Sequence, residues 1–294
     1  MHPIKAKVVN YLERANAGTS SMSEETIERA GRAFISMLHK RFNTQYNDDF
    51  RLRMSNIGRP TCQLQMKKAG APAENEKYFF PMQMMIGDMH EIMAIAIMEA
   101  AGVNITSQKE RAEFAADGVV IKGESDLSVD EGDGDQIWDV KSCSPWSFEH
   151  KFSKGFDAIA ENDAFGYVSQ GYSYAEGTGK KFGGWIAIQK VTGEWSICEA
   201  PQDVKTHDAA IERAKDVVKT VVEDAPFKRC FEDIEEKWYK KPTGNRTLDI
   251  ACKYCEFKWT CWPGLQYLPS IPSKAKNPTR KYYTVIKETE NDEC

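Results

Sequence analysis

The sequence predicts an α/β (α+β) fold in which helices flank one central mixed β-sheet. Helix-patterned and strand-patterned segments alternate along the chain in the order helix, strands, helix, strands, helix. Among the strand patterns, residues 123–142 have the form of two strands joined by an acidic turn. The 294 residues are 41% hydrophobic and 28% charged, which is typical of a globular chain large enough for one substantial core with an appended lobe.

Apolar spacing and end signals define the expected helices. Ser21 and Glu24 have capping-box spacing before the second of them, and Gly102 closes the longest, which is rich in Met and Ile. The expected helices cover residues 3–16, a segment after Ser23 with Ile27, Ala30, Phe34, Leu38 and Phe42 on one face, a segment starting at Pro60, then 81–101, 145–174 with a break at Gly155, and 202–223.

β-patterned segments fill the remainder of the central region. Four of them occur between Val103 and Ser142, separated by turn residues, and two more flank the turn at Thr192-Gly193. The expected strands lie within 103–108, 113–123, 124–129, 136–142, 182–190 and 194–200.

The candidate catalytic residues lie in the hairpin. Asp139 and Lys141 are two apart in a strand and therefore project from the same face, and Asp126 lies beside them if the hairpin pairs. Carboxylates that converge in a partly apolar sheet favour a hard divalent cation such as Mg²⁺. The alternative is an acidic turn followed by a solvated Asp/Lys pair, and the acids of residues 130–135 are assigned to that turn.

Two further motifs are candidates for the same site. His90 interrupts the apolar run of the 81–101 helix, and we interpret it as a metal ligand, the alternative being a hydrogen-bonded core histidine. Gln170 and Tyr174 are four residues apart and share one helix face.

A group of cysteines near the C-terminus indicates a second metal or cluster site. Cys252, Cys255 and Cys261 have the spacing of a metal or cluster site that lacks one ligand, and Cys62 is the natural fourth. The spacing fits zinc as well as iron–sulfur, and reduced thiols in a small aromatic core are the third possibility. The other four cysteines are expected to be structural or incidental: Cys143, Cys198, Cys230 and Cys294.

Charge distribution indicates a polyanionic partner despite the formal net charge of −5. Residues 51–68 hold five Lys/Arg and no acid, and residues 226–287 hold thirteen Lys/Arg against six Asp/Glu. No segment approaches about 18 uncharged apolar residues, so we expect no membrane association and a cytoplasmic location.

Together these motifs resemble the RecB-type branch of the PD-(D/E)XK nuclease superfamily, and within it the iron–sulfur exonucleases such as the CRISPR-associated and AddB-type enzymes. The resemblance runs from about Cys62 to Cys261 and rests on five motifs in the family's order. These are GDMH with His90, GESD with Asp126, D-x-K with Asp139 and Lys141, Q-x-x-x-Y with Gln170 and Tyr174, and one plus three cysteines. The first acid follows Ser125, where the family pattern has proline.

The resemblance implies a PD-(D/E)XK core that binds Mg²⁺ or Mn²⁺ through His90, Asp126, Asp139 and the Val140 carbonyl. Lys141 would orient the attacking water or stabilise charge on the phosphate, and Gln170 and Tyr174 would contact the DNA strand or the groups around the site. A structural 4Fe-4S cluster on Cys62, Cys252, Cys255 and Cys261 would help to shape a channel for single-stranded DNA.

The function implied is DNA exonuclease activity on single strands or ends, in recombination, repair or the processing of phage or mobile-element DNA. A phage enzyme would work in the cytoplasm of the infected host cell. The chain lacks a helicase phosphate loop, so unwinding would need a helicase or recombination partner. The alternatives are a structure-specific or sequence-specific endonuclease, a non-catalytic iron–sulfur DNA-binding protein, and a redox protein.

Three regions are expected. They are an N-terminal helical region with Cys62 (1–80), the nuclease core (81–225), and an iron–sulfur lobe with a basic tail (226–294).

Overall fold

The computed structural model describes residues 1–44, 49–161 and 163–287, which divide into two compact units. The core unit comprises Met1–Gly58 and Lys77–Val222, and the cysteine unit comprises Arg59–Glu76 and the chain from Glu223 onward. This division differs from the three expected regions. The first helices belong with the core because they pack on its longest helix, whereas the segment that carries Cys62 belongs with the C-terminal chain.

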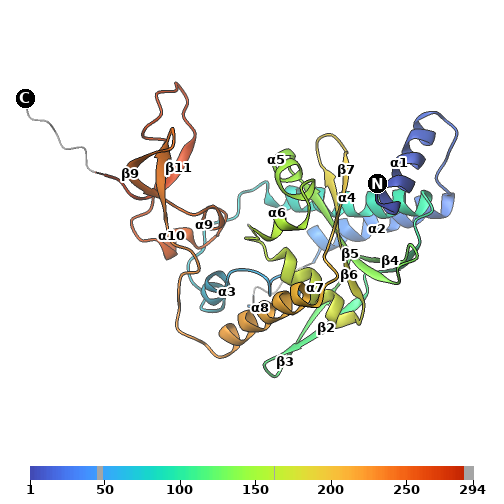
Figure 1. The fold of residues 1–294 in the computed structure, drawn as a ribbon, viewed down its shortest axis with the longest axis horizontal. Coiled ribbons are helices and arrows are strands. Elements are labelled where there is room, and N and C mark those ends of the chain that lie inside the picture. Colours follow the sequence, from blue (N-terminus) through green and yellow to red (C-terminus); the bar gives the residue numbers. More distant parts are fainter. Residues whose placement is uncertain (45–48, 162, 288–294) are drawn as a thin grey trace, which may run out of the picture. The chain divides into compact units, whose positions relative to one another are not determined.

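A five-stranded mixed sheet forms the centre of the core unit, with strand order β1-β4-β5-β6-β7 (Figure 1). Only β5 and β6 are parallel, and all other neighbours are antiparallel. The strands are β1 (Ile105–Gln108), β4 (Leu127–Val129), β5 (Gln136–Cys143), β6 (Lys181–Gln189) and β7 (Trp195–Glu199). The expected central mixed sheet is therefore confirmed.

Helices cover both faces of this sheet, because residues alternate between two hydrophobic clusters along β5. Trp138 and Val140 pack with α1 (Pro3–Asn16) and α4 (Phe80–Ala100), whereas Ile137 and Cys143 pack with α7 (Tyr167–Thr178) and α8 (Val204–Val222). Figure 1 shows α7 and α8 side by side. Asp139 and Lys141 alternate with Trp138 and Val140, so they belong to the α7 face.

The α2 helix (Glu24–Phe42) packs against α4 with a different face from the one its apolar spacing suggested. Thr26 and Met37 are its buried residues, whereas Ile27, Phe34 and Phe42 are exposed. Ser23, rather than Ser21, caps the helix by accepting a hydrogen bond from the Thr26 N–H at 3.2 Å. The capping box expected from Ser21 and Glu24 is therefore wrong, because the N-cap of the helix is Ser23, two residues after Ser21.

The expected single strand at 113–123 is instead a hairpin of its own, because Asp117 and Gly118 adopt positive φ angles of 44° and 74°. Strands β2 (Arg111–Ala116) and β3 (Val119–Glu124) pair in a separate two-stranded sheet. Between β5 and β6 the expected long helix is divided into α5 (Pro145–Ser147), the π-helical turn η1 (Phe148–Phe152), α6 (Phe156–Ala160) and α7. A break at Gly155, with φ of 97°, is confirmed.

The cysteine unit contains a four-stranded antiparallel sheet of order β10-β11-β9-β8 that the sequence patterns did not reveal. Its elements are α3 (Thr61–Lys68), β8 (Ile234–Trp238), β9 (Lys241–Thr247), α9 (Ile250–Lys253), α10 (Lys258–Cys261), β10 (Gln266–Pro269) and β11 (Arg280–Val285). Gln65 and Thr260 join the two parts of this unit: the Gln65 amide donates to the Ala225 carbonyl at 2.7 Å, and the Thr260 hydroxyl donates to the Pro72 carbonyl at 2.5 Å.

Candidate active site

The β4–β5 hairpin brings the two candidate aspartates together. Leu127 is paired with Trp138, so Asp126 lies at the end of β4 beside Asp139 of β5. One carboxylate oxygen of Asp126, Oδ2, accepts a hydrogen bond from the Val140 N–H at 2.9 Å, which fixes the carboxylate against the edge of β5. The pairing expected from the sequence is confirmed, and it places both carboxylates next to Lys141.

Asp139 and Lys141 form a buried ion pair. The ammonium of Lys141 donates to Oδ1 of Asp139 at 2.8 Å and lies 2.6 Å from Oδ2. Burial raises the pKa of Asp139, and Lys141 opposes that effect. Burial alone would lower the pKa of Lys141, but Asp139 and its other anionic neighbours raise it above the ordinary value. The ammonium also lies 4.9 Å from the centre of the Tyr167 ring, within cation–π range, and it therefore stays charged at neutral pH.

Glu91 is a member of this group that the sequence analysis passed over in favour of its neighbour His90. Lys109 pairs with the Glu91 carboxylate and also lies 3.4 Å from Oδ1 of Asp126, so one ammonium joins the two acids. Burial, and then the charges of Asp126 and Asp139, raise the pKa of Glu91 to about 7.

A sequence signal for Glu91 exists in Gly87, one helical turn earlier. A Cβ at Gly87 would lie 3.7 Å from the Ser142 hydroxyl, so this stretch of α4 approaches the end of β5 that follows Lys141. Residues four apart share one face of a helix. Glu91 therefore lies on the face of α4 that carries Gly87.

Among the described residues, His90 hydrogen-bonds with the backbone of its own helix and not with the acidic side chains. Its Nδ1 lies 2.7 Å from the Ile86 carbonyl, which can only accept, so Nδ1 carries the proton and Nε2 is left as the acceptor. His150 makes the same contact with the Trp146 carbonyl at 2.9 Å, so the bond reflects helix geometry rather than a special site. Within the described residues, His90 forms no ion pair with Asp126 or Asp139.

Gln170 and Tyr174 lie on α7, as expected. They are hydrogen-bonded to each other, and Tyr174 is buried. Burial, followed by the charges of Asp139 and Asp126, raises the pKa of Tyr174 to about 12, so its hydroxyl remains protonated and available as a donor.

In the part of the chain that the structure describes, no three His, Cys, Asp or Glu side chains are assembled into a metal site. The donor chemistry nevertheless suits a divalent cation. Oδ2 of Asp139 is buried and contacts the Lys141 ammonium at 2.6 Å, and Glu91, Asp126 and Asp139 repel one another electrostatically. A hard cation would relieve that repulsion and fill the remaining lone pairs.

All four proposed cluster cysteines belong to the cysteine unit. Cys252 and Cys261 pack against Leu248, Trp262 and Leu265. Burial raises the pKa of the Cys252 thiol to about 11 and also raises that of Cys255.

Cys230, expected to be incidental, lies beside Cys62. The Cys62 N–H points to the Cys230 sulfur at 3.3 Å, and the two thiols are hydrogen-bonded, which lowers the pKa of Cys230. The preceding Arg229 fixes this segment, because its guanidinium donates to the Cys261 carbonyl at 2.6 Å.

The remaining described cysteines lie in the core unit and not in the cysteine unit. Cys143 and Cys198 are buried in the core cluster on the α7 face, where burial raises the pKa of each to about 12. Thiols of this kind are packing residues. Cys294 lies outside the described residues.

Comparisons with known proteins add little to this description. No family model matches the chain, and no curated protein matches its sequence. A solved structure described as the crystal structure of SSO0001 has a TM-score of 0.41 and 14% sequence identity, over 79% of this chain and 95% of that one. Within the described residues, no helix has the length and apolar character needed to cross a membrane.

Proposed function

We propose that this protein is a divalent-metal-dependent deoxyribonuclease with a PD-(D/E)XK core, acting as an exonuclease on single-stranded DNA or DNA ends. The observation that carries the proposal is the convergence of Asp126, Asp139 and Lys141 on adjacent strands, with Glu91 and Lys109 beside them. A solvated surface pair has no reason to be buried in this way. The order α4, hairpin, β5, α7, β6 also agrees with the proposal.

The chain's own residues have distinct roles in this proposal. Lys141 acts as a fixed cation that stabilises charge on the phosphoryl oxygens, because the charge of Asp139 keeps it protonated and so unsuited to accept a proton. Tyr174, which is held by Gln170, offers a hydroxyl donor to the strand or to the aspartates.

Asp126, Asp139 and the Val140 carbonyl would hold Mg²⁺ or Mn²⁺, with His90 or Glu91 from α4 as a further ligand. A bound cation supplies two effects, polarisation of the scissile phosphate and a lower pKa of the attacking water. Of the two α4 side chains, Glu91 is favoured, because the position that buries it and so raises its pKa also brings it within electrostatic reach of Asp126 and Asp139.

The four cysteines Cys62, Cys252, Cys255 and Cys261 would hold a structural 4Fe-4S cluster, or zinc as the alternative. The fit is chemical: four thiols from two distant segments belong to one small unit whose described sheet and hydrophobic cluster are modest in size. The group would stabilise that unit, and a partner helicase or recombination protein would supply any unwinding.

The test is a cleavage assay on protein purified without oxygen, whose absorbance reports any iron–sulfur cluster. End-labelled linear and circular DNA, single-stranded and double-stranded, is incubated with Mg²⁺ or Mn²⁺. An exonuclease shortens linear DNA from an end and leaves circles intact, whereas cleavage of circles indicates the endonuclease alternative. No cleavage of any substrate by metal-loaded protein that binds DNA would leave the non-catalytic alternative.

A further inference from the structure

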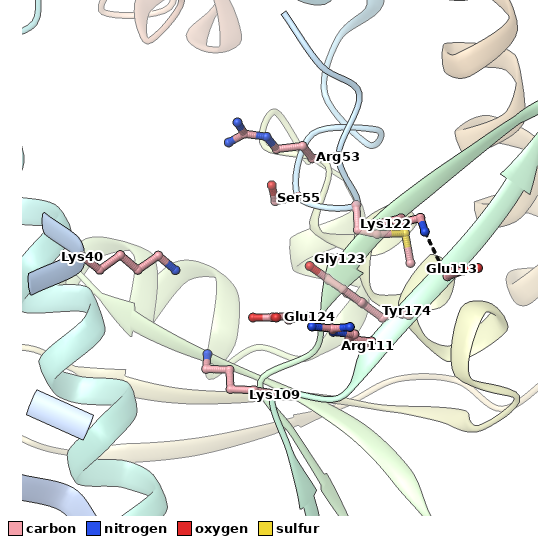
Figure 2. Close-up of a pocket in the computed structure, with 12 residues that line it drawn as sticks. Lys40, Arg53, Ser55, Lys109, Arg111, Glu113, Lys122, Gly123, Glu124 and Tyr174 are labelled. Carbon is pink, nitrogen blue, oxygen red and sulfur yellow. Dashed lines mark ion pairs between the residues drawn. The ribbon is translucent and has the colours of Figure 1, made fainter. Parts of the chain in front are cut away.

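A cavity of about 520 Å³ opens in the core unit beside the acidic site (Figure 2). Its walls come from the end of α2, the 53–55 segment, the β2–β3 hairpin and Tyr174. Five cations and two acids line it: Lys40, Arg53, Lys109, Arg111, Lys122, Glu113 and Glu124. The volume suits a ligand about as large as one nucleotide or somewhat larger.

Local hydrogen bonds and packing hold the wall that carries Arg53. The Arg53 N–H donates to the Asn56 side-chain oxygen at 2.9 Å, and the Asn56 amide donates to the Arg51 carbonyl at 3.0 Å. Met54 is fully buried against β3, and a Cβ at Gly123 would lie 2.6 Å from Met54, so only glycine permits this approach. Arg53 therefore lies on a hydrogen-bonded turn that packs against β3, and its side chain lines the cavity.

The cations that line the cavity differ in whether they are already paired with acidic residues. Lys122 is paired with Glu113 at 2.9 Å, and Lys109 is engaged by the acidic site. Arg53 and Arg111, by contrast, form no side-chain hydrogen bond or ion pair with any residue that the structure describes. Glu124 is the cross-strand partner of Arg111, so a carboxylate lies on the same face of the hairpin.

The cavity and the acidic site share residues. Lys109 lines the cavity and pairs with Glu91 and Asp126, and Tyr174 lines it while its pKa responds to Asp139 and Asp126. A strand with a phosphate at the acidic site therefore has this cavity directly beside it.

We propose that this cavity binds the phosphate backbone of the DNA strand, with Arg53 and Arg111 as separate contacts to it. The inference rests on the proposed nuclease function and adds to it the position of the strand. Guanidinium groups bind phosphate oxygens through paired N–H donors, so each arginine suits one phosphate contact. Each such phosphate is either an internal diester or the monoester at a strand end.

The experiment measures binding without cleavage, in EDTA, by fluorescence anisotropy. Single-stranded oligonucleotides carry a 5′-phosphate, a 3′-phosphate or neither. The variants are Arg53→Gln, Arg111→Gln and the double variant, with Arg32→Gln as the matched control, because Arg32 lies on α2 outside the cavity and pairs with Glu28 at 3.2 Å.

Each cavity variant should weaken binding roughly tenfold and lower the slope of log K against log salt by about 0.7, the value for one phosphate contact on a single strand. Arg32→Gln should change neither quantity. Glu124→Gln should tighten binding several-fold, a change that loss of a purely structural role would not produce. Weakening confined to one phosphorylated end identifies the monoester, and equal weakening on all strands identifies an internal diester.

Binding by the double variant equal to that of Arg32→Gln would overturn the inference, even if the wild-type protein cleaves DNA. Conversely, if the cavity variants lose affinity and salt dependence but the wild-type protein cleaves nothing, the proposed function fails and the cavity remains a phosphate site. Circular dichroism of each variant separates loss of affinity from loss of fold.

Discussion

At the scale of single residues, the acidic site is a set of charges that stabilise one another only in combination. Lys141 compensates Asp139, and Lys109 compensates Glu91 and Asp126. Removing one member leaves a partly buried charge without its partner, which is costly. Variants are therefore best chosen to keep shape while they remove charge.

The first prediction concerns cleavage. Asp126→Asn, Asp139→Asn and Lys141→Ala should each lower the cleavage rate by at least about 100-fold, because in the proposed function each removes a group that would act on the scissile phosphate, directly or through the cation. Lys141→Arg should recover little activity, since the wider guanidinium does not fit where the ammonium meets Asp139. DNA affinity in EDTA should change little. Near-wild-type cleavage by the three variants would refute the site.

His90→Ala and Glu91→Gln distinguish the two candidate ligands of α4. Burial, and then the charges of Asp126 and Asp139, raise the pKa of Glu91, so this carboxylate lies close to both aspartates and Glu91→Gln should weaken Mn²⁺ binding more than His90→Ala does. Isothermal titration calorimetry with Mn²⁺ alone measures this without DNA. The reverse order would return the role to the histidine expected from the sequence.

The second prediction is a pH dependence of stability. The pKa of Glu91 is raised from 4.5 to about 7 in the folded protein, so between these values the folded state binds more protons than the unfolded state. Its stabilising contribution is complete below the ordinary pKa and is lost as the pH rises to about 7. Asp139, whose pKa is raised by burial, acts in the same direction.

Metal-free Glu91→Gln should therefore gain about 1–2 kcal/mol over the wild-type protein at pH 8, while the two proteins should differ little near pH 5. Urea unfolding across this range provides the measurement. Mg²⁺ should stabilise the wild-type protein more than the variant. Parallel curves for the two proteins would show that Glu91 is not a strained carboxylate.

At the scale of elements, the site depends on how β5 lies against β6. The register of this parallel pair shifts between Ile137 and Trp138, opposite the two glycines of β6, Gly183 and Gly184. A Cβ at Gly183 would lie 2.3 Å from Cε2 of Trp138, the residue before Asp139. These glycines allow a tryptophan to fill the core immediately beside Asp139.

The third prediction follows from that contact. Gly183→Ala should destabilise the protein by about 1–3 kcal/mol, since the indole must move to admit the methyl group. It should also lower cleavage, because Asp139 moves with Trp138. Gly31→Ala is the control, as a Cβ there meets nothing within 4 Å and alanine favours the helix. Equal urea midpoints for the two variants would contradict the packing argument.

At the scale of the whole molecule, the two units are each built from segments distant in the sequence. Closing the cysteine unit brings Cys62 close to residues about two hundred positions later in the chain. A metal or cluster that bridges these segments would hold the unit closed.

The fourth prediction tests this bridge. Replacing Cys62, Cys252, Cys255 or Cys261 by alanine should give one shared phenotype, namely loss of colour or zinc and faster proteolysis after about residue 225, because each change frees the same closure. Cys143→Ala and Cys198→Ala should retain the metal and lose only local packing, on the order of 1–2 kcal/mol. Iron, zinc and absorbance are measured after purification without oxygen.

A Cys230 variant tests whether Cys230 is itself a metal ligand or only a neighbour of Cys62. The Cys230 sulfur contacts the Cys62 N–H. Cys230→Ala should therefore lower the stability of the metal-loaded unit, as Cys62→Ala does, but without removing the metal. Complete metal loss in Cys230→Ala would make it a ligand. Wild-type metal content in Cys62→Ala would refute the bridge itself.

Local sequence patterns are enough to predict the order and type of most elements of the core unit. Periodicity and turn residues located the long α4 helix, the β4–β5 hairpin and the break at Gly155, because these depend on local preferences and on which side chains can face a core. The neighbourhood of Asp126, Asp139 and Lys141 followed as well, since pairing in a hairpin is set by its turn.

Contacts between distant segments depend on how the whole chain packs, and local patterns do not predict them. Gly87 marks the face of α4 that carries Glu91, but the choice of Glu91 over His90 depends on Lys109, Asp126 and Asp139, which the fold brings from other elements. The sequence patterns missed three other features for the same reason. These are the contact of Cys230 with Cys62, the exposed apolar side chains of α2, and the cavity lined by Arg53 and Arg111. Burial and electrostatic coupling are properties of the packed chain, and sequence patterns report only the preferences of each segment alone.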